Sequence, residues 1–575
     1  MAGRSGAKRE DDHGDHPDHG DYGDQGGKLG HRPSAAAGGA TAPVAPPPAV
    51  TLGAARLTPD AVVAVARAGA TVELAPAAVA RIRAARALVE RLIDEDRTVY
   101  GVTTGFGHLS RVKIARDTLA DLQRNLIRSH ASGIGEPLDV PTTRAVVLLL
   151  ANSLSRGHSG VRVDLVRLLI GLLNAGVTPV VPARGSVGAS GDLAPLAHLA
   201  LVLIGEGEAW FAGERLAGGA ALRRAELEPT TLAAKEGLAL INGTHVMEAC
   251  GILAVHDTRK LLRAAEVAAA ASTEALLGSY VPLDPRIHAL RPQPGQAHTA
   301  ARLRALLVAS EINPSHADCG RVQDPYSLRC VPQVLGAARD GLDYCAAVVA
   351  DELGAVTDNP LLFPADGDTV GDVLTGGNFH GQPLALALDF LAIILAQVAS
   401  FSERRAYSLL GPHDWDTGEH AAPLFLTPRP GLNSGYMIAQ YAAAALVNEI
   451  KVLAHPASVD SIPTSAGMED FVSMGVTAAL KARQALDLAF NVVAIELICA
   501  CQALEFRRPL RPGRGVEAAY AAVRQVVPAL DADRPPSPDI QRLAAAIRAG
   551  ALDDLVPDAS LVTDIPPADG HTPRR

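Results

Sequence analysis

The chain has 575 residues, of which 48% are hydrophobic and only 4% aromatic. That length allows several ordinary domains or one large helical subunit. The abundance of Ala and Leu favours packed helices with an aliphatic core over a strand-rich fold. The formal net charge is −10 and no long Lys/Arg run is present, which argues against nucleic acid or an anionic membrane as a partner and favours a small polar substrate.

The N-terminal segment, residues 1–48, combines Gly, Asp, His, Ala and Pro with hardly any large aliphatic side chains. Such a segment cannot bury enough apolar surface to fold, so we expect a disordered tail and assign its histidines no metal site. The chain lacks a basic stretch followed by an apolar one at its start, which predicts a cytoplasmic protein. Its cysteines form no paired motif and are predicted to be reduced, buried thiols. They are Cys250, Cys319, Cys330, Cys345, Cys499 and Cys501.

Apolar residues recur at helical spacing from Leu52 onward, and after about Ile252 they form long segments. These segments are 252–278, 299–311, 332–354, 382–410, 434–454 and 473–505. Two of them are apolar enough for a membrane, but Asp389, Asp487 and Glu496 would be costly in lipid, so we expect buried bundle helices. The pattern predicts a mainly α fold in which an elongated helix bundle (252–510) follows a smaller, loop-rich N-terminal domain (49–251) and precedes a C-terminal helical segment and tail (511–575).

Ala189-Ser190-Gly191 lies in a loop of small residues that runs from Gly185 to Pro195. Clusters of this kind are usually plain loops before helices. Here, however, the backbone nitrogen of Gly191 could attack the carbonyl of Ala189 with loss of water, and Ser190 could lose a second water. The product would be a five-membered ring with an electrophilic methylidene group, and Gly191 would suit this approach because it has no Cβ. Asp192 is predicted to be a helix N-cap.

Two other motifs carry groups suited to acid–base chemistry or anion binding. Tyr100 opens a segment with three glycines, ending at Gly107, which suits a mobile lid that could bring a phenol to a site, although Tyr100 could also be a core aromatic beside a turn. Gln323, Tyr326 and Arg329 are spaced by three residues and would share one helix face. Arg329 could bind a substrate carboxylate through two parallel hydrogen bonds, or it could simply form a salt bridge at a helix start.

Taken together, these motifs resemble those of the aromatic amino acid ammonia-lyase and aminomutase family, in the same order and over residues 52–510. The resemblance implies that Ala189, Ser190 and Gly191 form 4-methylideneimidazole-5-one (MIO) autocatalytically, with no metal or soluble cofactor. It also implies a homotetramer whose active sites are shared between subunits.

Within this resemblance, Tyr100 matches the proposed general base and Arg329 the carboxylate clamp, with Gln323 and Tyr326 near the substrate and the prosthetic group.

Two further positions match residues beside the prosthetic group. Asn242, in Ile241-Asn-Gly-Thr-His245, matches the asparagine next to the ring, and Phe379, in Gly376-Gly-Asn-Phe-His380, matches the phenylalanine that faces it. His245 is a departure, because histidine ammonia-lyases commonly carry Gln there.

Three positions indicate the side chain of the substrate. His130 follows Ser129 in a pair that resembles the Ser-His pair of histidine ammonia-lyases, and Met437 matches their pocket methionine. Glu469 stands where phenylalanine-type enzymes typically carry Gln. A carboxylate buried against a phenyl ring would lack a partner, whereas an imidazole N–H can donate to it. His130 could instead only cap a helix, and Glu469 could be a solvated residue beside Asp470.

The expected reaction is therefore the non-oxidative elimination of ammonia from L-histidine, which gives trans-urocanate. Tyr100 is the leading candidate for the base that removes the β-proton, and Glu469 is either an alternative base or a group that orients the imidazole. A tyrosine or phenylalanine ammonia-lyase or an aminomutase is the nearest alternative. A non-catalytic helical assembly protein is a remote one.

Overall fold

The computed structural model describes residues 47–105, 112–317, 321–365, 371–413, 416 and 421–555. The predicted N-terminal tail up to residue 46, Phe106 and Gly107 of the expected lid, Cys319 and the last twenty residues lie outside the described part. The helices of the described part are α1 (Pro59–Ala68), α2 (Pro76–Asp94), α3 (Leu119–His130), α4 (Val140–Ser155), α5 (Val163–Ala175), α6 (Leu193–Leu203), α7 (Gly218–Arg224), α8 (Glu236–Ile241), α9 (His245–Ala275), α10 (Pro285–Ala289), α11 (Pro294–Leu306), α12 (Ile312–Ser315), α13 (Tyr326–Arg329), α14 (Val331–Glu352), α15 (Gln382–Leu410), α16 (Met437–Leu453), α17 (Gly475–Glu505), α18 (Arg514–Val526) and α19 (Ser537–Ala549).

The strands are short and form small separate sheets. They are β1 (Val50–Leu52), β2 (Val72–Leu74), β3 (Ile134–Pro137), β4 (Thr178–Pro179), β5 (Pro182–Arg184), β6 (Glu208–Phe211), β7 (Glu214–Ala217), β8 (Leu361–Phe363) and β9 (Asp372–Leu374). β1 pairs with β2 in parallel, while β3–β5, β4–β6–β7 and β8–β9 are antiparallel. The β3–β5 pair matters most, because β5 leads directly into the loop that contains Ser190.

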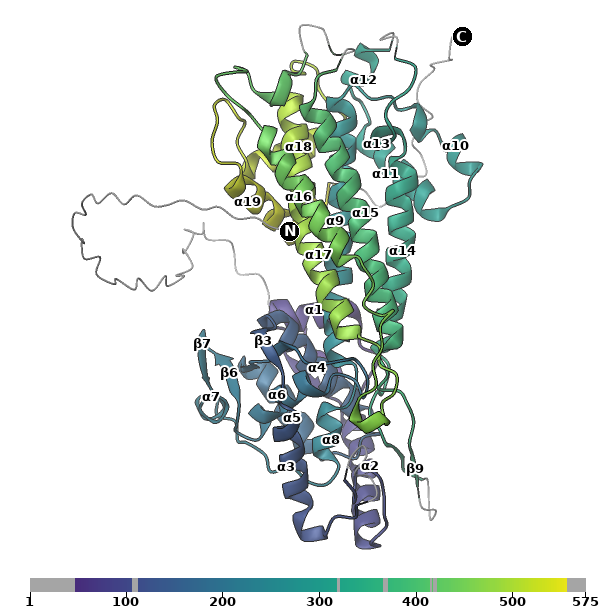
Figure 1. The fold of residues 1–575 in the computed structure, drawn as a ribbon, viewed down its shortest axis with the longest axis vertical. Coiled ribbons are helices and arrows are strands. Elements are labelled where there is room, and N and C mark those ends of the chain that lie inside the picture. Colours follow the sequence, from purple (N-terminus) through teal and green to yellow (C-terminus); the bar gives the residue numbers. More distant parts are fainter. Residues whose placement is uncertain are drawn as a thin grey trace, which may run out of the picture. The chain divides into compact units, whose positions relative to one another are not determined.

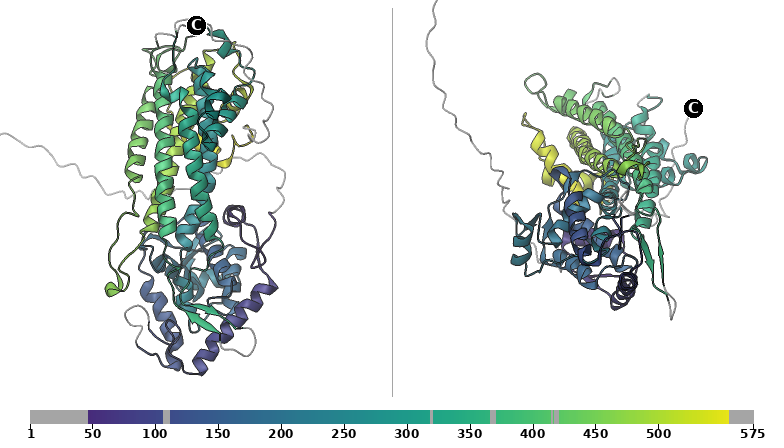
Figure 2. Two further views of the ribbon diagram at one scale, coloured as in Figure 1. Left: turned by 90° about the vertical axis from the view of Figure 1, so that its right-hand side faces the viewer. Right: turned by 60° about the horizontal axis from the view of Figure 1, so that its bottom comes forward.

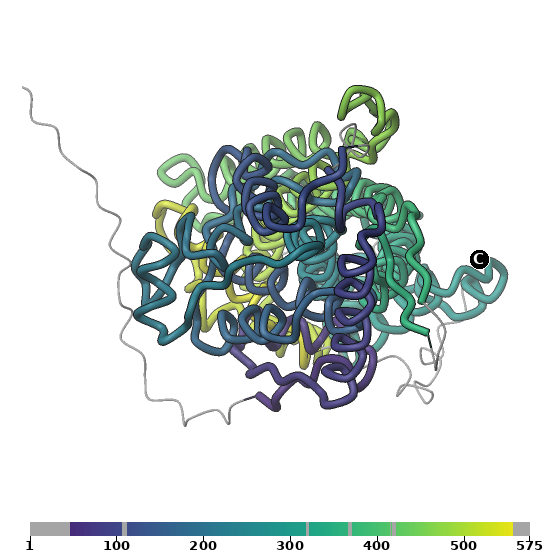
Figure 3. Tube along the Cα trace, turned by 90° about the horizontal axis from the view of Figure 1, so that it is seen from below, coloured from purple at the N-terminus to yellow at the C-terminus, as the bar shows by residue number. Residues whose placement is uncertain are grey.

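The long helices α9, α14, α15, α16 and α17 run side by side and form the bundle, as both side views show (Figures 1 and 2). Figure 3 looks at the same bundle from below, with the N-terminal part, purple to blue, nearest the viewer. The core is made of Leu, Val, Ile and Ala side chains. The prediction of a mainly α fold with an aliphatic core is therefore confirmed.

One element begins earlier than its apolar pattern predicts. α9 starts at His245, so the predicted boundary between residues 251 and 252 lies inside this helix. Its first turn carries His245 and Glu248, which are buried although they are polar. A search for apolar periodicity does not register such residues as core positions.

α15 and α17 are long and apolar enough to cross a membrane by length and composition, with 61% and 78% of their most apolar windows buried inside the chain. Their charged residues have partners within the bundle. Asp389 accepts a hydrogen bond from the backbone N–H of Ser458 at 2.7 Å, and Glu496 accepts one from the guanidinium of Arg405 at 2.5 Å. Both helices pack as core elements, which agrees with the expectation from their charges.

The free cysteines of the described part are Cys250, Cys330, Cys345, Cys499 and Cys501. Four of them are buried, and Cys330 is only partly buried.

Candidate active site

The loop from Gly185 to Asp192 is anchored by the starts of two long helices. The carbonyl of Gly188 accepts hydrogen bonds from the N–H of Gly381 at 3.1 Å and from the hydroxyl of Ser473 at 2.8 Å. These residues immediately precede α15 and α17. Because helix N-termini carry partial positive charge, the loop lies where negative charge is stabilised.

Gly191 is at a position that only glycine can occupy. Its φ is +75°, and a Cβ built there would lie 2.0 Å from the carbonyl oxygen of Gly243. The backbone of Ser190 is also left-handed, with a φ of +53°. Hydrogen bonds from Gly243 N–H to the Ser190 carbonyl (3.3 Å) and from Asp192 N–H to the Gly243 carbonyl (2.7 Å) hold this tight turn against the segment that carries Asn242.

Asp192 stands at the start of one helix and caps another with its side chain. It stands at the N-cap position of α6, but its side chain makes no capping hydrogen bond there. The carboxylate instead accepts hydrogen bonds from the N–H groups of Val246 (2.8 Å) and Met247 (3.1 Å) in the first turn of α9. Asp192 therefore occupies a helix N-cap position, as expected, but its side chain bonds the start of α9, which the Gly191–Gly243 contact brings to this carboxylate. Burial raises the pKa of Asp192 to about 7.

A group of buried polar side chains lies behind the loop at the start of α9. Burial, together with the nearby carboxyls of Glu352 and Asp192, raises the pKa of Glu248 well above its usual range. Burial also raises the pKa of Glu352, which accepts a hydrogen bond from Thr244. His245 is 3% exposed, neither ring nitrogen has a hydrogen-bond partner within the described part, and burial lowers its pKa to about 4. His245 is therefore a neutral residue packed beside the loop.

Glu469 lies next to the serine of the tripeptide. Its Oε1 accepts a hydrogen bond from the Ser190 hydroxyl at 2.9 Å, and its Oε2 accepts one from Thr464 at 3.0 Å. Glu469 is partly buried, whereas its neighbour Asp470 is exposed. The structure thus brings together two predicted site residues that are 279 positions apart.

Asn242 is 3% exposed at the end of α8. Its side-chain amide donates to the Asp358 carboxylate at 3.3 Å and to the Asn359 carbonyl at 3.2 Å. Asp358 in turn accepts a hydrogen bond from the ammonium of Lys235 at 2.6 Å. Sequence analysis did not single out Lys235 or Asp358. The available signal was the charged pair Lys235-Glu236 within the otherwise apolar run 232–241, where a charge needs a buried partner.

The remaining candidates on the loop side of the molecule are His130, Phe379 and Tyr100. His130 ends α3, close to the β3–β5 pair, and its Nδ1 lies 2.9 Å from the Leu126 carbonyl, as expected if it caps the helix. Phe379 is half-buried, two residues before the Gly381 that contacts the loop. Tyr100 is half-buried and packs against the main core, and its neighbour Val102 packs on α2 and β8.

Gln323, Tyr326 and Arg329 lie at the other end of the bundle. Asp324, beside them, accepts a hydrogen bond at 2.7 Å from the N–H of Ser279, which follows the C-terminal end of α9. The loop contacts the opposite end of α9, and Figure 1 shows α13 and α8 at opposite ends of the long helices. α14 separates Arg329 from the loop region with 22 residues, about 33 Å of helix.

Gln323 and Tyr326 are exposed, and Arg329 is partly buried. Only Tyr326 and Arg329 belong to α13, so the prediction that all three share one helix face is wrong. Tyr326 is 69% exposed, and the Arg329 guanidinium lies over its ring at 4.5 Å from the centroid. The Arg329 Nε has no hydrogen-bond partner within the described part. A guanidinium in this state can still bind an anion.

Met437 shares the far end with this group. It begins α16, and Gln440 in the same turn donates to Glu403 at 2.7 Å, near the C-terminal end of α15. The N-terminal end of α15 contacts the loop. One chain therefore does not bring Met437 and Arg329 to Ser190.

Comparisons with known proteins agree with this architecture. The family model described as "Aromatic amino acid lyase" matches residues 57–525. The chain is 55% identical to a histidine ammonia-lyase of Anaeromyxobacter sp. (strain K), over 81% of this chain and 92% of that protein. It is 53% identical to one of Gloeobacter violaceus, over 87% and 96% respectively.

Among solved structures, the histidine ammonia-lyase of Trypanosoma cruzi matches with a TM-score of 0.81 and 42% identity, over 92% of this chain and all of that one. A tyrosine aminomutase from Streptomyces globisporus matches with a TM-score of 0.82 and 35% identity, over 90% of this chain and all of that one. The predicted family resemblance and the prediction of a carbon–nitrogen lyase are confirmed. The chain belongs to the aromatic amino acid lyase family.

Proposed function

We propose that this protein is a histidine ammonia-lyase that converts L-histidine to trans-urocanate and ammonia. The observation that carries the proposal is the 2.9 Å hydrogen bond between Ser190 and Glu469, which places a carboxylate beside the predicted source of the electrophile. A carboxylate there can accept a hydrogen bond from an imidazole N–H and would be left without a partner beside a phenyl ring. The 55% identity to a histidine ammonia-lyase supports the same substrate.

The tripeptide suits the proposed prosthetic group, 4-methylideneimidazole-5-one. Ser190 and Gly191 both have left-handed backbone conformations, and the contact of Gly191 with Gly243 leaves no room for a Cβ. When formed, the group supplies an electrophile that activates the amino acid for loss of ammonia. The anchoring contacts of Gly188 and Asp192 would hold it in place.

The remaining predicted site residues bind the substrate or transfer its proton. Arg329 binds the substrate carboxylate, and Tyr326 and Gln323 lie beside it. Glu469 orients the imidazole, while Tyr100 removes the β-proton, with Glu469 as the alternative base.

His130, Phe379 and Met437 complete the pocket around the substrate. Asn242 lies beside the prosthetic group. The cytoplasmic location and the domain boundaries stay predictions.

We further propose that each active site is built from more than one copy of the chain, in a homotetramer. The distance of about 33 Å along α14 separates Arg329 from Ser190 within one chain. A partner of the same sequence would also cover apolar side chains that are exposed on the long helices. These are Tyr344, Leu386, Phe390, Ile393, Tyr407, Ile438, Tyr441 and Val452.

The test is to incubate the purified protein with L-histidine, L-tyrosine or L-phenylalanine and to follow the ultraviolet absorbance of the conjugated product. We expect turnover of L-histidine, and the intact mass of the protein should be lower than the sequence mass by two water molecules. Ser190→Ala should abolish both the loss of two waters and turnover. Turnover of tyrosine or phenylalanine without histidine would contradict the proposed substrate. An unmodified mass with no turnover would favour a non-catalytic assembly protein.

A further inference from the structure

Lys235 and Asp358 form an ion pair that is almost completely removed from solvent. Their side chains are 0% and 2% exposed, and Nζ lies 2.6 Å from the carboxylate. Burial lowers the pKa of Lys235, and the adjacent Asp358 carboxylate counteracts this shift. A buried pair of this kind is often no more stabilising than apolar side chains of the same size. Stability alone therefore does not account for a lysine here.

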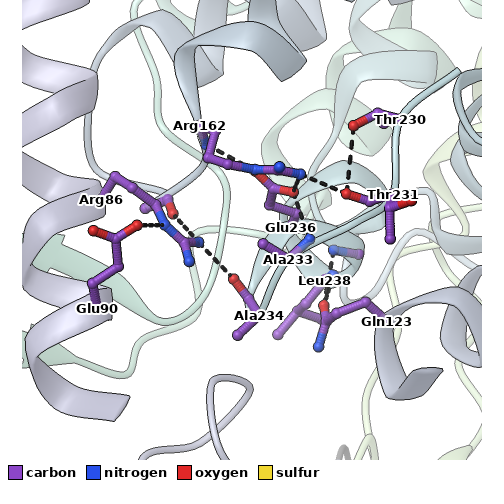
Figure 4. A network of polar contacts seen from close by, with 12 residues as sticks. Arg86, Glu90, Gln123, Arg162, Thr230, Thr231, Ala233, Ala234, Glu236 and Leu238 are labelled. Atoms are coloured by element: carbon purple, nitrogen blue, oxygen red, sulfur yellow. Dashed lines mark hydrogen bonds and ion pairs between the residues drawn. The ribbon is translucent and has the colours of Figure 1, made fainter. Parts of the chain in front are cut away.

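The backbone of Lys235 is held in an unfavourable conformation by its neighbours. Its φ is +75°, in the left-handed region that non-glycine residues rarely adopt. On one side Arg86 donates to the Ala234 carbonyl at 3.0 Å, and on the other Arg162 forms an ion pair with Glu236 at 2.6 Å. Figure 4 shows this network, in which Gln123 also accepts a hydrogen bond from the start of α8. Such a conformation persists only when its surroundings fix it.

The pair determines which way the Asn242 amide faces. Both contacts of its Nδ2 are to acceptors, the Asp358 carboxylate (3.3 Å) and the Asn359 carbonyl (3.2 Å). An amide nitrogen has two hydrogens to donate, and these two contacts use both. If the amide were turned, its oxygen would face two other acceptors, so the network allows one orientation.

The same turn also reaches the segment that carries Phe379. The side-chain oxygen of Asn359 accepts a hydrogen bond from the Gly376 N–H at 2.8 Å. The Asp358–Asn359 turn is therefore bonded to two separate segments of the candidate active site.

We propose that Lys235 and Asp358 are positioning residues that fix the Asn242 amide, so that Asn242 offers the active site a carbonyl oxygen and no N–H donor. Such an oxygen accepts a hydrogen bond from a cationic donor, which fits the ammonium group of an amino acid substrate. This role of Asn242 rests on the proposed function, because the ammonium group is that of the amino acid from which ammonia is eliminated. The Lys235 ammonium is the counter-charge of the Asp358 carboxylate, and a carboxylate can only accept hydrogen bonds.

The test compares Lys235→Met with Asp358→Asn, using whichever of L-histidine, L-tyrosine and L-phenylalanine the wild type turns over fastest. In Lys235→Met the buried Asp358 carboxyl has no counter-charge, and burial then favours its neutral form. Its O–H can then donate to the Asn242 oxygen, and the amide can turn. We expect kcat/KM to fall by about tenfold to a hundredfold in both variants, with the two-water mass loss retained.

The pH profile separates positioning from a structural role. As pH rises, the Asp358 carboxyl of Lys235→Met loses its proton, so the activity of this variant relative to wild type should recover. Asp358→Asn has no carboxyl at this position, so its relative activity should not recover. The other titratable groups near this turn are shared by all the proteins, so their effects cancel in the ratio. They are Asp192, Glu248, Glu352 and His245 on the loop side and the Arg162–Glu236 pair beside Lys235.

Arg405→Met is the matched control, because Arg405 and Glu496 form another fully buried ion pair, within the helix bundle. It should lower the unfolding temperature without the pH-dependent loss of kcat/KM. Unchanged kcat/KM in folded Lys235→Met and Asp358→Asn, or parallel pH profiles for these two, would overturn the proposal. A wild type that prefers another amino acid would contradict only the histidine assignment, since the comparison between variants uses the preferred substrate.

Discussion

The separation of Ser190 from Arg329 leads to a quantitative prediction about mixed assemblies. Ser190→Ala removes the hydroxyl from which the electrophile forms, and Arg329→Met removes the carboxylate-binding guanidinium. Each variant alone should be inactive or nearly so. The 22 residues of α14 between the two regions span about 33 Å, far more than an arginine side chain and a bound amino acid can bridge together.

If every active site takes Ser190 from one chain and Arg329 from another, random mixing of equal amounts restores some complete sites. The chance that the first chain carries Ser190 is one half, and the chance that the second carries Arg329 is one half. A random mixture should therefore show about one quarter of wild-type activity per site, and tetramers selected for both chains slightly more, about 29%. The complete sites would contain two native residues, so their KM should equal that of wild type.

The assay co-expresses the two variants with different affinity tags and purifies assemblies that carry both tags. Turnover of L-histidine is then compared with each variant purified alone and with wild type carrying both tags. Activity no higher than that of the single variants would refute the reasoning, because it would mean that both residues come from one chain. A folded and assembled state, checked by size-exclusion chromatography, is the control for either result.

Three further predictions concern the loop and its surroundings. Glu469→Gln removes a charged hydrogen-bond acceptor worth about 1.5–3 kcal/mol. The ratio of kcat/KM for L-histidine to kcat/KM for L-phenylalanine should therefore fall by roughly tenfold to a hundredfold. An unchanged ratio in steady-state assays would contradict the role of Glu469 in selecting imidazole. Gly191→Ala places a Cβ 2.0 Å from the Gly243 carbonyl oxygen, so mass spectrometry should find no loss of two waters, and a normal loss would show that the turn can relax. Glu248 has a raised pKa in the folded protein, so its contribution to stability is present at low pH and is lost as pH rises through the folded pKa. The unfolding temperature of wild type should fall between about pH 5 and about pH 8, and the fall should be smaller in Glu248→Gln. If the fall is as large in Glu248→Gln as in wild type, another group causes it.

The sequence predicts the long helices well, because at most of their buried positions the residue is apolar and only a few are polar or charged. The predicted segments 382–410 and 473–505 agree closely with α15 and α17. The start of α9 was missed because its first turn buries His245 and Glu248, whose polarity hides their place in the core.

Contacts between distant parts of the chain are the features that local patterns do not contain. Ser190 and Glu469 are 279 positions apart, and Lys235 and Asp358 are 123 apart. A motif identifies each member of such a pair but not the pairing, which depends on how the helices are connected. The cap formed by Asp192 shows the same limit, since its nearest helix in sequence is α6 and the helix it bonds is α9.

The buried carboxyls near the loop are consistent with its position at the helix N-termini. The starts of α9, α15 and α17 direct partial positive charge toward residues 185–192, and ionised carboxylates behind the loop would cancel that charge. Burial raises the pKa of both Glu248 and Glu352, so these groups are held toward their neutral forms. The positive ends of the helices are therefore left to stabilise negative charge that develops on the loop. Because the same burial raises the pKa of Asp192 to about 7, this balance should weaken as pH rises above neutrality.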